Sequence, residues 1–327
     1  MRADWQPSAP LENLRQRASL LAQVRAFFAE RGVLEVETPL LCQATVTDLH
    51  LDSLLVEMGS RNQKGQRRFL QTSPEFAMKR LLAAGSGPIY QLCKAFRRDE
   101  SGSRHNPEFS MLEWYRPGLD EVQLMDEVES LLRACLPGDL LPADRFVRVT
   151  YRELFQQYLD LDPFVTASDE LIHRACLIAG ANISAMQLSR NGALDLLMSH
   201  AIEPQLQSPV FVTQFPASQA ALARVVPDAE GTDVAQRFEL FVRGMEIANG
   251  YHELTDAQEQ SRRFAEDNVR RARVGLPVHP VDERLLAAMR SGLPDCAGVA
   301  LGFDRLMMLA VNTARIADVI SFTADHA

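Results

Sequence analysis

Residues 89–117 read IYQLCKAFRRDESGSRHNPEFSMLEWYRP. Two strand-like runs, 89–97 and 108–116, flank a charged loop at 98–107, and this arrangement predicts a long β-hairpin. The period of two in the first run places bulky side chains on one face and small or polar ones on the other: Tyr90, Leu92 and Phe96 against Gln91, Cys93, Ala95 and Arg97. The bulky face suits a core. The other face leaves room for a ligand whose phosphate or carboxylate Arg97 would clamp.

The returning strand adds an aromatic ring, a carboxylate and a phenol on one face. These residues follow one another at the strand period: Phe109, Met111, Glu113 and Tyr115. Such a row can stack a base and orient an amine. An ordinary surface hairpin with an ion pair is the alternative, but the cationic groups of the loop favour a nucleoside triphosphate site beside the stacking face.

The N-terminal stretch predicts a helix followed by a strand. Apolar residues recur every three or four positions over 11–31, which is typical of an amphipathic helix that ends at Gly32. Residues 33–38 alternate like a strand, and Pro39 closes it because proline has no N–H to donate.

A second helix is expected just before the hairpin. Strands are expected within 49–58 and 69–72. Residues 73–75, Ser-Pro-Glu, then combine a helix cap, a first-turn proline and a first-turn carboxylate, so a helix should run to Gly85.

The second half of the chain predicts a helical insertion and then a return to strands. Residues 119–203 are mostly helical in pattern, with breaks at proline and glycine, and we interpret them as an insertion without chemistry. Strands are expected at 210–215 and 238–246, and a charged helix over 256–274.

Residues 243–254, RGMEIANGYHEL, contain the dipeptide Asn249-Gly250, a strong signal for a two-residue hairpin turn. With that turn, Glu246 and Glu253 would face each other across the ladder and would need a compensating cation. Mg²⁺, which carboxylates and substrate phosphates hold together, is the natural candidate. The alternative is a different register with both glutamates in solvent.

Residues 298–305, GVALGFDR, predict a strand that enters a helix at Arg305. Small residues at alternate positions let a strand approach a ligand closely, and the start of a helix can meet a phosphate. A packing role for these small residues is the alternative.

Composition narrows the class of protein. Of 327 residues, 46% are hydrophobic, and 34 Lys and Arg stand against 43 Asp and Glu, a net charge of −9 that argues against binding nucleic acid through bulk charge. The five cysteines are far apart, with no zinc-type spacing, and are expected to be reduced thiols. With no signal peptide and no membrane span in the pattern, we expect a soluble, cytoplasmic protein of one domain, 1–327.

Together these segments resemble the three motifs of class II aminoacyl-tRNA synthetases, most closely those of the lysyl branch. Residues 27–39 are similar to motif 1, residues 96–109 to motif 2, and Gly302-Phe303-Asp304-Arg305 to motif 3; Glu246-x-x-Asn249-Gly250-x-x-Glu253 is similar to the metal-bearing segment. The resemblance runs from about residue 13 to residue 322. It implies an α+β fold, an antiparallel sheet flanked by helices with a helical insertion at about 119–205, and a homodimer through motif 1.

Two departures from the pattern of lysyl-tRNA synthetases make the chain more similar to the elongation factor P lysine ligases. Only about a dozen residues precede the first helix, where similar lysyl-tRNA synthetases carry an anticodon-binding OB domain, and Ala300 replaces the middle glycine of motif 3. One methyl group in the pocket floor is worth about 1–3 kcal/mol of discrimination. The ligase family activates (R)-β-lysine with ATP and transfers it to a lysine of elongation factor P, so no tRNA and no membrane partner are expected.

The resemblance also implies roles for individual residues. For ATP it implies Arg97, Arg98, Asp99, Asn106, Phe109, Glu246, Ile247, Gly302 and Arg305, with Arg97, Arg305 and Glu246 as the catalytic set. For the diamino acid it implies Ser73, Glu75, Tyr115, Glu253 and Ala300, and for Mg²⁺ it implies Glu246 and Glu253. Asp99 stands where these families usually have Glu, and Glu100 is a candidate to replace it.

Three alternatives remain at this stage. A truncated lysyl-tRNA synthetase would charge tRNA, an enzyme of the asparagine synthetase type would release a small amide, and a non-catalytic paralogue would only bind a ligand. The presence of Arg97, Glu246, Glu253 and Arg305 disfavours the last.

Overall fold

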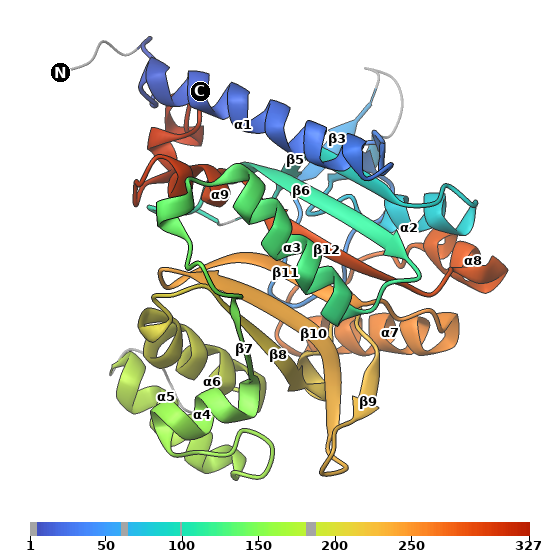
Figure 1. Ribbon diagram of the computed structural model, residues 1–327. Coiled ribbons are helices and arrows are strands. Elements are labelled where there is room, and N and C mark those ends of the chain that lie inside the picture. Colours follow the sequence, from blue (N-terminus) through green and yellow to red (C-terminus); the bar gives the residue numbers. More distant parts are fainter. Residues whose placement is uncertain (1–4, 60–64, 99, 181–187) are drawn as a thin grey trace. The chain divides into compact units, whose positions relative to one another are not determined.

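The computed structural model describes residues 5–59, 65–98, 100–180 and 188–327 (Figure 1). The chain forms two compact units. The first consists of Met1–Leu119, Ala134–Leu136 and Leu254–Ala327, and the second of Asp120–Arg133 and Pro137–Glu253.

The first unit contains the predicted hairpin at the centre of a sheet. Its strands lie in the order β1 (Leu34–Glu35), β5 (Ile89–Phe96), β6 (Glu108–Pro117), β12 (Cys296–Gly302), and all neighbours except β1 and β5 are antiparallel. A smaller sheet has the order β2 (Leu41–Cys42), β4 (Gln66–Leu70), β3 (Leu55–Met58). The helices are α1 (Leu11–Glu30), α2 (Glu75–Ala83), α7 (Ala257–Arg273), α8 (Glu283–Gly292) and α9 (Phe303–Ala310), followed by the short turns η6 (Ile316–Asp318) and η7 (Ala324–His326).

Helix α1 covers the bulky face of the hairpin (Figure 1). Phe28 stacks on Tyr90 with ring centroids 4.3 Å apart and meets Trp114 edge-on at 5.3 Å. Tyr90 therefore lies in the core as predicted. The division into a core face and an open face is only partly confirmed, because Gln91 and Ala95 of the expected open face are also buried, whereas Leu92 and Phe96 are only partly buried.

Several predicted elements are shorter than expected or shifted. Strand β1 has two residues where 33–38 was predicted, and β3 and β4 cover 55–58 and 66–70 in place of 49–58 and 69–72. Ser73 is not the cap of α2: Pro74 holds that position, although the Ser73 hydroxyl still accepts a hydrogen bond from the Glu75 N–H at 3.0 Å.

The second unit is built on another run of antiparallel strands. The order is β11 (Met245–His252), β10 (Asp233–Val242), β8 (Val210–Pro216), β7 (Val147–Thr150), with β7 parallel to β8 and β9 (Val225–Pro227) paired to β10. Its helices are α4 (Tyr151–Leu159), α5 (Ser168–Ala179), α6 (Arg190–Leu197) and most of α3 (Glu121–Cys135), and the shorter turns are η1 (Gly138–Leu140), η3 (Met198–Ile202), η4 (Glu203–Gln205) and η5 (Ala217–Gln219). Figure 1 shows α4, α5 and α6 gathered beside β7 and β8. The stretch predicted as helical thus also supplies a strand, β7.

The predicted turn at Asn249-Gly250 is wrong. Strand β11 runs straight through both residues, and the turn lies at Arg243-Gly244, where both residues have positive φ, 54° and 64°. Asn249 therefore pairs with Glu239 and Gly250 with Phe238. Glu246 and Glu253 lie seven positions apart along one chain segment and do not face each other across a ladder.

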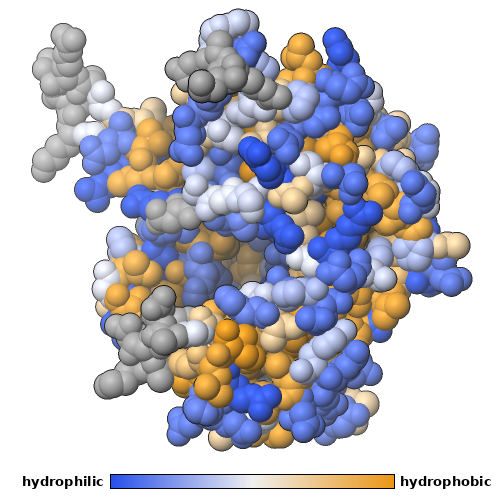
Figure 2. Space-filling view, turned by 90° about the vertical axis from the view of Figure 1, so that its left-hand side faces the viewer, coloured by the Kyte–Doolittle hydropathy of each residue, from blue (hydrophilic) through white to orange (hydrophobic). Residues whose placement is uncertain are grey.

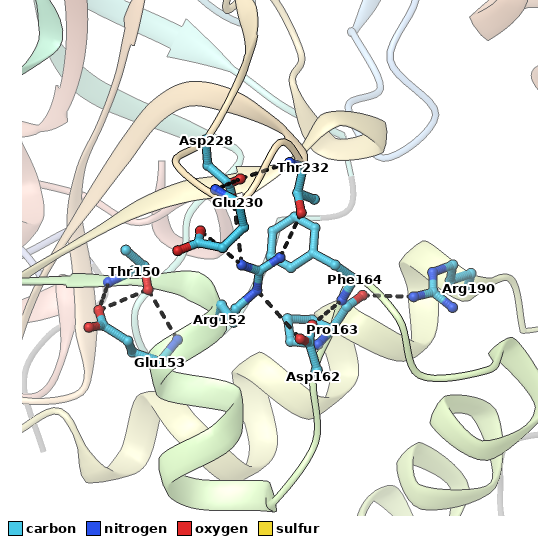
Figure 3. Close-up of polar contacts among 10 residues, drawn as sticks. All are labelled: Thr150, Arg152, Glu153, Asp162, Pro163, Phe164, Arg190, Asp228, Glu230 and Thr232. Carbon is cyan, nitrogen blue, oxygen red and sulfur yellow. Dashed lines mark hydrogen bonds and ion pairs between the residues drawn. The ribbon is translucent and has the colours of Figure 1, made fainter.

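Arg152 fastens the β9–β10 turn to the start of α4 (Figure 3). Its guanidinium lies 3.5 Å from Asp162 and 3.3 Å from Asp228 and donates to the Thr232 hydroxyl at 2.9 Å. It also lies over the Phe164 ring, 4.6 Å from the centroid. Arg152 thus ties the β9–β10 turn and the segment after α4 to helix α4 within the second unit.

One face of the molecule is mixed in character. Hydrophilic and hydrophobic residues form small interspersed patches on the face drawn in Figure 2. Within the described part of the chain, none of the helices combines the length and the apolar composition that crossing a membrane requires.

Candidate active site

The open face of the first unit's sheet carries a row of small and polar side chains. Across β5, β6 and β12, Gln91 pairs with Glu113, and Glu113 pairs with Ala300. Paired residues in antiparallel strands point to the same side of a sheet. On the same side, β12 contributes Gly298 and Gly302 next to Ala300, so this strand leaves space above the sheet.

Glu113 is the buried charge of this face. Its side chain is only 2% exposed, and it accepts hydrogen bonds from the Ser73 hydroxyl at 2.7 Å and from the Tyr115 hydroxyl at 2.6 Å. Both donors are neutral hydroxyls, which orient the carboxylate. A buried carboxylate of this kind is suited to binding an ammonium group.

The strand period grouped Glu113 with Phe109 and Tyr115 in a row that could orient an amine, but Glu113 was not among the residues for which the resemblance implied a role. The structure adds that Ser73, from the segment before α2, and Tyr115 converge on this carboxylate.

Glu75, for which the resemblance implies contact with the diamino acid, forms an ion pair within its own helix. It opens α2, and its carboxylate lies 2.6 Å from the ammonium group of Lys79, which is 1% exposed. This ion pair at positions i and i+4 supplies the counter-charge that a partly buried carboxylate requires. Ser73 and Glu75 also line a cavity of about 550 Å³ within the first unit.

The other end of β5 holds the predicted anion-binding group. Arg97 forms an ion pair with Glu100 at 3.1 Å, and its guanidinium lies 5.0 Å from the centroid of the Phe109 ring. The Nε of Arg97 is buried and has no hydrogen-bond partner among the described residues. Glu100 therefore does contact Arg97, as suggested by its place beside Asp99, which itself lies outside the described residues.

Motifs 2 and 3 meet at a pair of side chains. The Arg305 Nη2 and His105 Nε2 atoms lie 2.8 Å apart, which brings the start of α9 next to the hairpin loop. Arg98 contacts a different segment: its backbone N–H donates to the Asp52 carbonyl at 2.8 Å.

Asn106 holds backbone at both ends of its amide. Its Nδ2 donates to the Glu108 carbonyl at 2.6 Å, and its Oδ1 accepts from the Ala324 N–H at 2.9 Å. The side chain thus fixes the loop against the C-terminal segment of the first unit.

The remaining predicted site residues belong to the second unit. Glu246 and the buried Ile247 lie on β11, and the buried Glu253 follows its end. A charged pair on the neighbouring strand was not predicted: the side chains of Arg237 and Glu239 form an ion pair and a hydrogen bond.

Negative charge accumulates around this pair. Burial raises the pKa of Glu239 to about 8, the Arg237 guanidinium opposes this rise, and the carboxylates of Glu246 and Glu203 add to it. Carboxylate oxygens so placed are the donors that a hard divalent cation prefers. No group of three or more acidic, histidine or cysteine side chains in the described residues is already arranged around a metal position.

Comparison with known proteins identifies the family. The family model described as tRNA synthetases class II (D, K and N) matches residues 3–326. Proteins named elongation factor P--(R)-beta-lysine ligase from Salmonella paratyphi B, Salmonella arizonae and Salmonella heidelberg are each 49% identical to this chain over 328 residues, covering 99% of both chains. The chain belongs to this ligase family. The predicted fold class, an α+β class II synthetase domain with mostly antiparallel strands flanked by helices, is confirmed.

Proposed function

We propose that this chain activates (R)-β-lysine with ATP as an aminoacyl adenylate and transfers it to a lysine side chain of elongation factor P. The observation that carries the proposal is one sheet face with the buried carboxylate of Glu113 at one end and Arg97 at the other. The 49% identity to ligases named for this reaction supports it.

The spacing along β5 orients a diamino acid. Gln91, which pairs with Glu113, precedes Arg97 by six positions, or about 20 Å of strand at 3.3 Å per residue. The side chain of Arg97 and an extended diamino acid together would fill this distance. The reacting carboxylate would therefore lie toward Arg97, and the distal ammonium group would lie at Glu113.

In the first step, a carboxylate oxygen of the substrate attacks the α-phosphorus of ATP, and the bond to pyrophosphate breaks. Arg97 would neutralise charge on the α-phosphate and the carboxylate while Phe109 stacks the adenine. Arg305 would hold the γ-phosphate. The other residues proposed to contact the nucleotide are Arg98, Asp99, Asn106, Glu246, Ile247 and Gly302.

We propose that Glu246 and Glu253 hold Mg²⁺, because carboxylate oxygens and substrate phosphates are the ligands that this ion prefers. When bound, the ion would neutralise phosphate charge and orient the leaving pyrophosphate.

In the second step, the amine of the acceptor lysine attacks the adenylate carbonyl and AMP leaves. The residues proposed to surround the diamino acid are Ser73, Glu75, Glu113, Tyr115, Glu253 and Ala300. Because the acceptor is a translation factor, the reaction would take place in the cytoplasm and would not use tRNA.

A transfer assay tests the proposal directly. The enzyme, ATP and Mg²⁺ are incubated with labelled α- or β-lysine in the presence of both bulk tRNA and elongation factor P. Label that resists nuclease, is lost to protease and is stronger with β-lysine is the expected result. Nuclease-sensitive label would identify a minimal tRNA synthetase, a labelled free amide would identify an asparagine synthetase type, and no pyrophosphate exchange would identify a binding paralogue.

A further inference from the structure

Gln91 is a buried amide with an unused acceptor next to the most buried charge of the open face. Its side chain is 2% exposed, and its Oε1 has no hydrogen-bond partner among the described residues. The amide also acts to lower the pKa of the Cys93 thiol, against the larger rise that burial causes. An acceptor left unsatisfied at this depth costs stability, and a group that persists despite that cost calls for an explanation.

The register of the sheet places this acceptor beside Glu113. The two residues are direct partners across β5 and β6, and side chains of such partners have Cβ atoms about 4.5–5.5 Å apart on the same face. Glu113 already receives the hydroxyls of Ser73 and Tyr115. The local group thus offers one negative charge and one neutral carbonyl oxygen toward the same space.

We infer that Gln91 is a specificity-determining residue that accepts a hydrogen bond from the distal ammonium group of the diamino acid bound at Glu113. An ammonium group carries three N–H donors and needs more acceptors than one carboxylate in a dry site. A glutamine provides the second acceptor without a second negative charge, so the bound cation and Glu113 neutralise each other. This inference rests on the proposed function.

Two variants distinguish a structural role of Gln91 from a ligand role, because the two roles predict opposite answers to which variant impairs the enzyme more. Gln91→Met keeps the size of the side chain but removes the acceptor, and Gln91→Glu keeps an acceptor but adds a buried charge. If Gln91 only packed, Gln91→Met would be the milder change. If it binds ammonium, Gln91→Glu retains diamino acid recognition and Gln91→Met loses it.

The experiment measures ATP–pyrophosphate exchange with β-lysine and with 3-aminohexanoate, which lacks the distal amine. For Gln91→Met, we expect the ratio of kcat/KM for β-lysine to kcat/KM for 3-aminohexanoate to fall by about 10- to 100-fold, because one hydrogen bond to a charged group is lost. The change should appear in the KM for β-lysine, and the KM for ATP should stay unchanged. Gln260→Leu, which alters another buried glutamine of the first unit, is the matched control and should leave the ratio unchanged.

Each remaining result has a defined meaning. An unchanged ratio in a folded Gln91→Met, or a loss of the ratio only in Gln91→Glu, overturns the inference. If Gln91→Met does not fold, Gln91→Leu and Gln91→Glu give the same comparison. Failure of the wild-type enzyme to activate either α- or β-lysine would instead overturn the proposed function.

Discussion

Phe238 of β10 lies directly opposite Gly250 of β11, so close that a Cβ built on residue 250 would be 2.4 Å from Cζ of the ring. The ring is fully buried and meets Phe211 edge-to-face with centroids 5.6 Å apart, so any shift of the ring would disturb core packing. Position 250 is a glycine because the Phe238 ring approaches the strand closely there, and not because the chain turns.

Gly250→Ala is expected to destabilise the second unit by about 1–3 kcal/mol, the usual cost of overpacking a tight core. Urea unfolding followed by circular dichroism measures the change. Gly138→Ala is the matched control, because no atom lies within 4 Å of a Cβ at that position. Equal stability of the two variants would contradict the close packing of Phe238.

The same pair explains why one part of the site could not be predicted from sequence. Asn249-Gly250 carries the strongest short-range turn signal in the segment, yet the chain turns at Arg243-Gly244 and uses Gly250 for tertiary packing. Local dipeptides do not reveal which ring will lie across a ladder. By contrast, the two-residue period of 89–117 depends only on strand geometry, and it predicted both the hairpin and the face that holds Glu113. The pairing of Glu75 with Lys79 was available from the helical spacing but was not anticipated.

Ala300 pairs with Glu113 across β12 and β6, and the resemblance implies that its methyl group lies in the floor of the amino acid pocket. Ala300→Gly is expected to improve kcat/KM for α-lysine relative to β-lysine by roughly 5- to 100-fold, since one methyl group is worth about 1–3 kcal/mol of discrimination. Pyrophosphate exchange with each amino acid gives the ratio. A ratio identical to that of the wild type would remove Ala300 from the specificity determinants.

Arg97→Lys and Arg97→Ala should both reduce pyrophosphate exchange, by about 100- to 1000-fold, because a preorganised cationic donor at the reacting phosphate is lost. Lysine keeps the charge but not the planar fork that binds two oxygens. Arg67→Lys, on the exposed strand β4, is the control and should behave as wild type. Normal exchange by folded Arg97→Ala would refute the position of the phosphate site.

His279 should make the fold sensitive to mild acid. Burial and the nearby Arg271 guanidinium lower its pKa, while Asp52, 3.4 Å from its Nε2, opposes this. The unfolded chain therefore binds a proton at higher pH than the folded chain, and the stability of the neutral form is lost as pH falls through about 6.5.

The measurement is the free energy of unfolding between pH 7.5 and 5.5. It should decline in the wild type and decline less in His279→Gln, whereas the exposed His50→Gln should follow the wild type. An equal slope in His279→Gln and the wild type would show that another group titrates in this range.

Large apolar side chains of the first unit lie in solvent, and together with the resemblance to motif 1 this predicts a homodimer. Leu34 of motif 1 is 56% exposed, Leu40 just after the motif is 38% exposed, and Leu55 on β3 is 40% exposed. The resemblance of residues 27–39 to the dimer motif of class II synthetases explains this exposure, since burial of apolar area in an interface drives stable association.

Sedimentation velocity at micromolar concentration should give twice the mass of one chain. Leu34→Glu should shift the population toward the monomer, whereas Leu177→Glu, at an exposed leucine of α5, should not. A wild-type monomer under these conditions would contradict the dimer, and a dimer unaffected by Leu34→Glu would place its interface elsewhere.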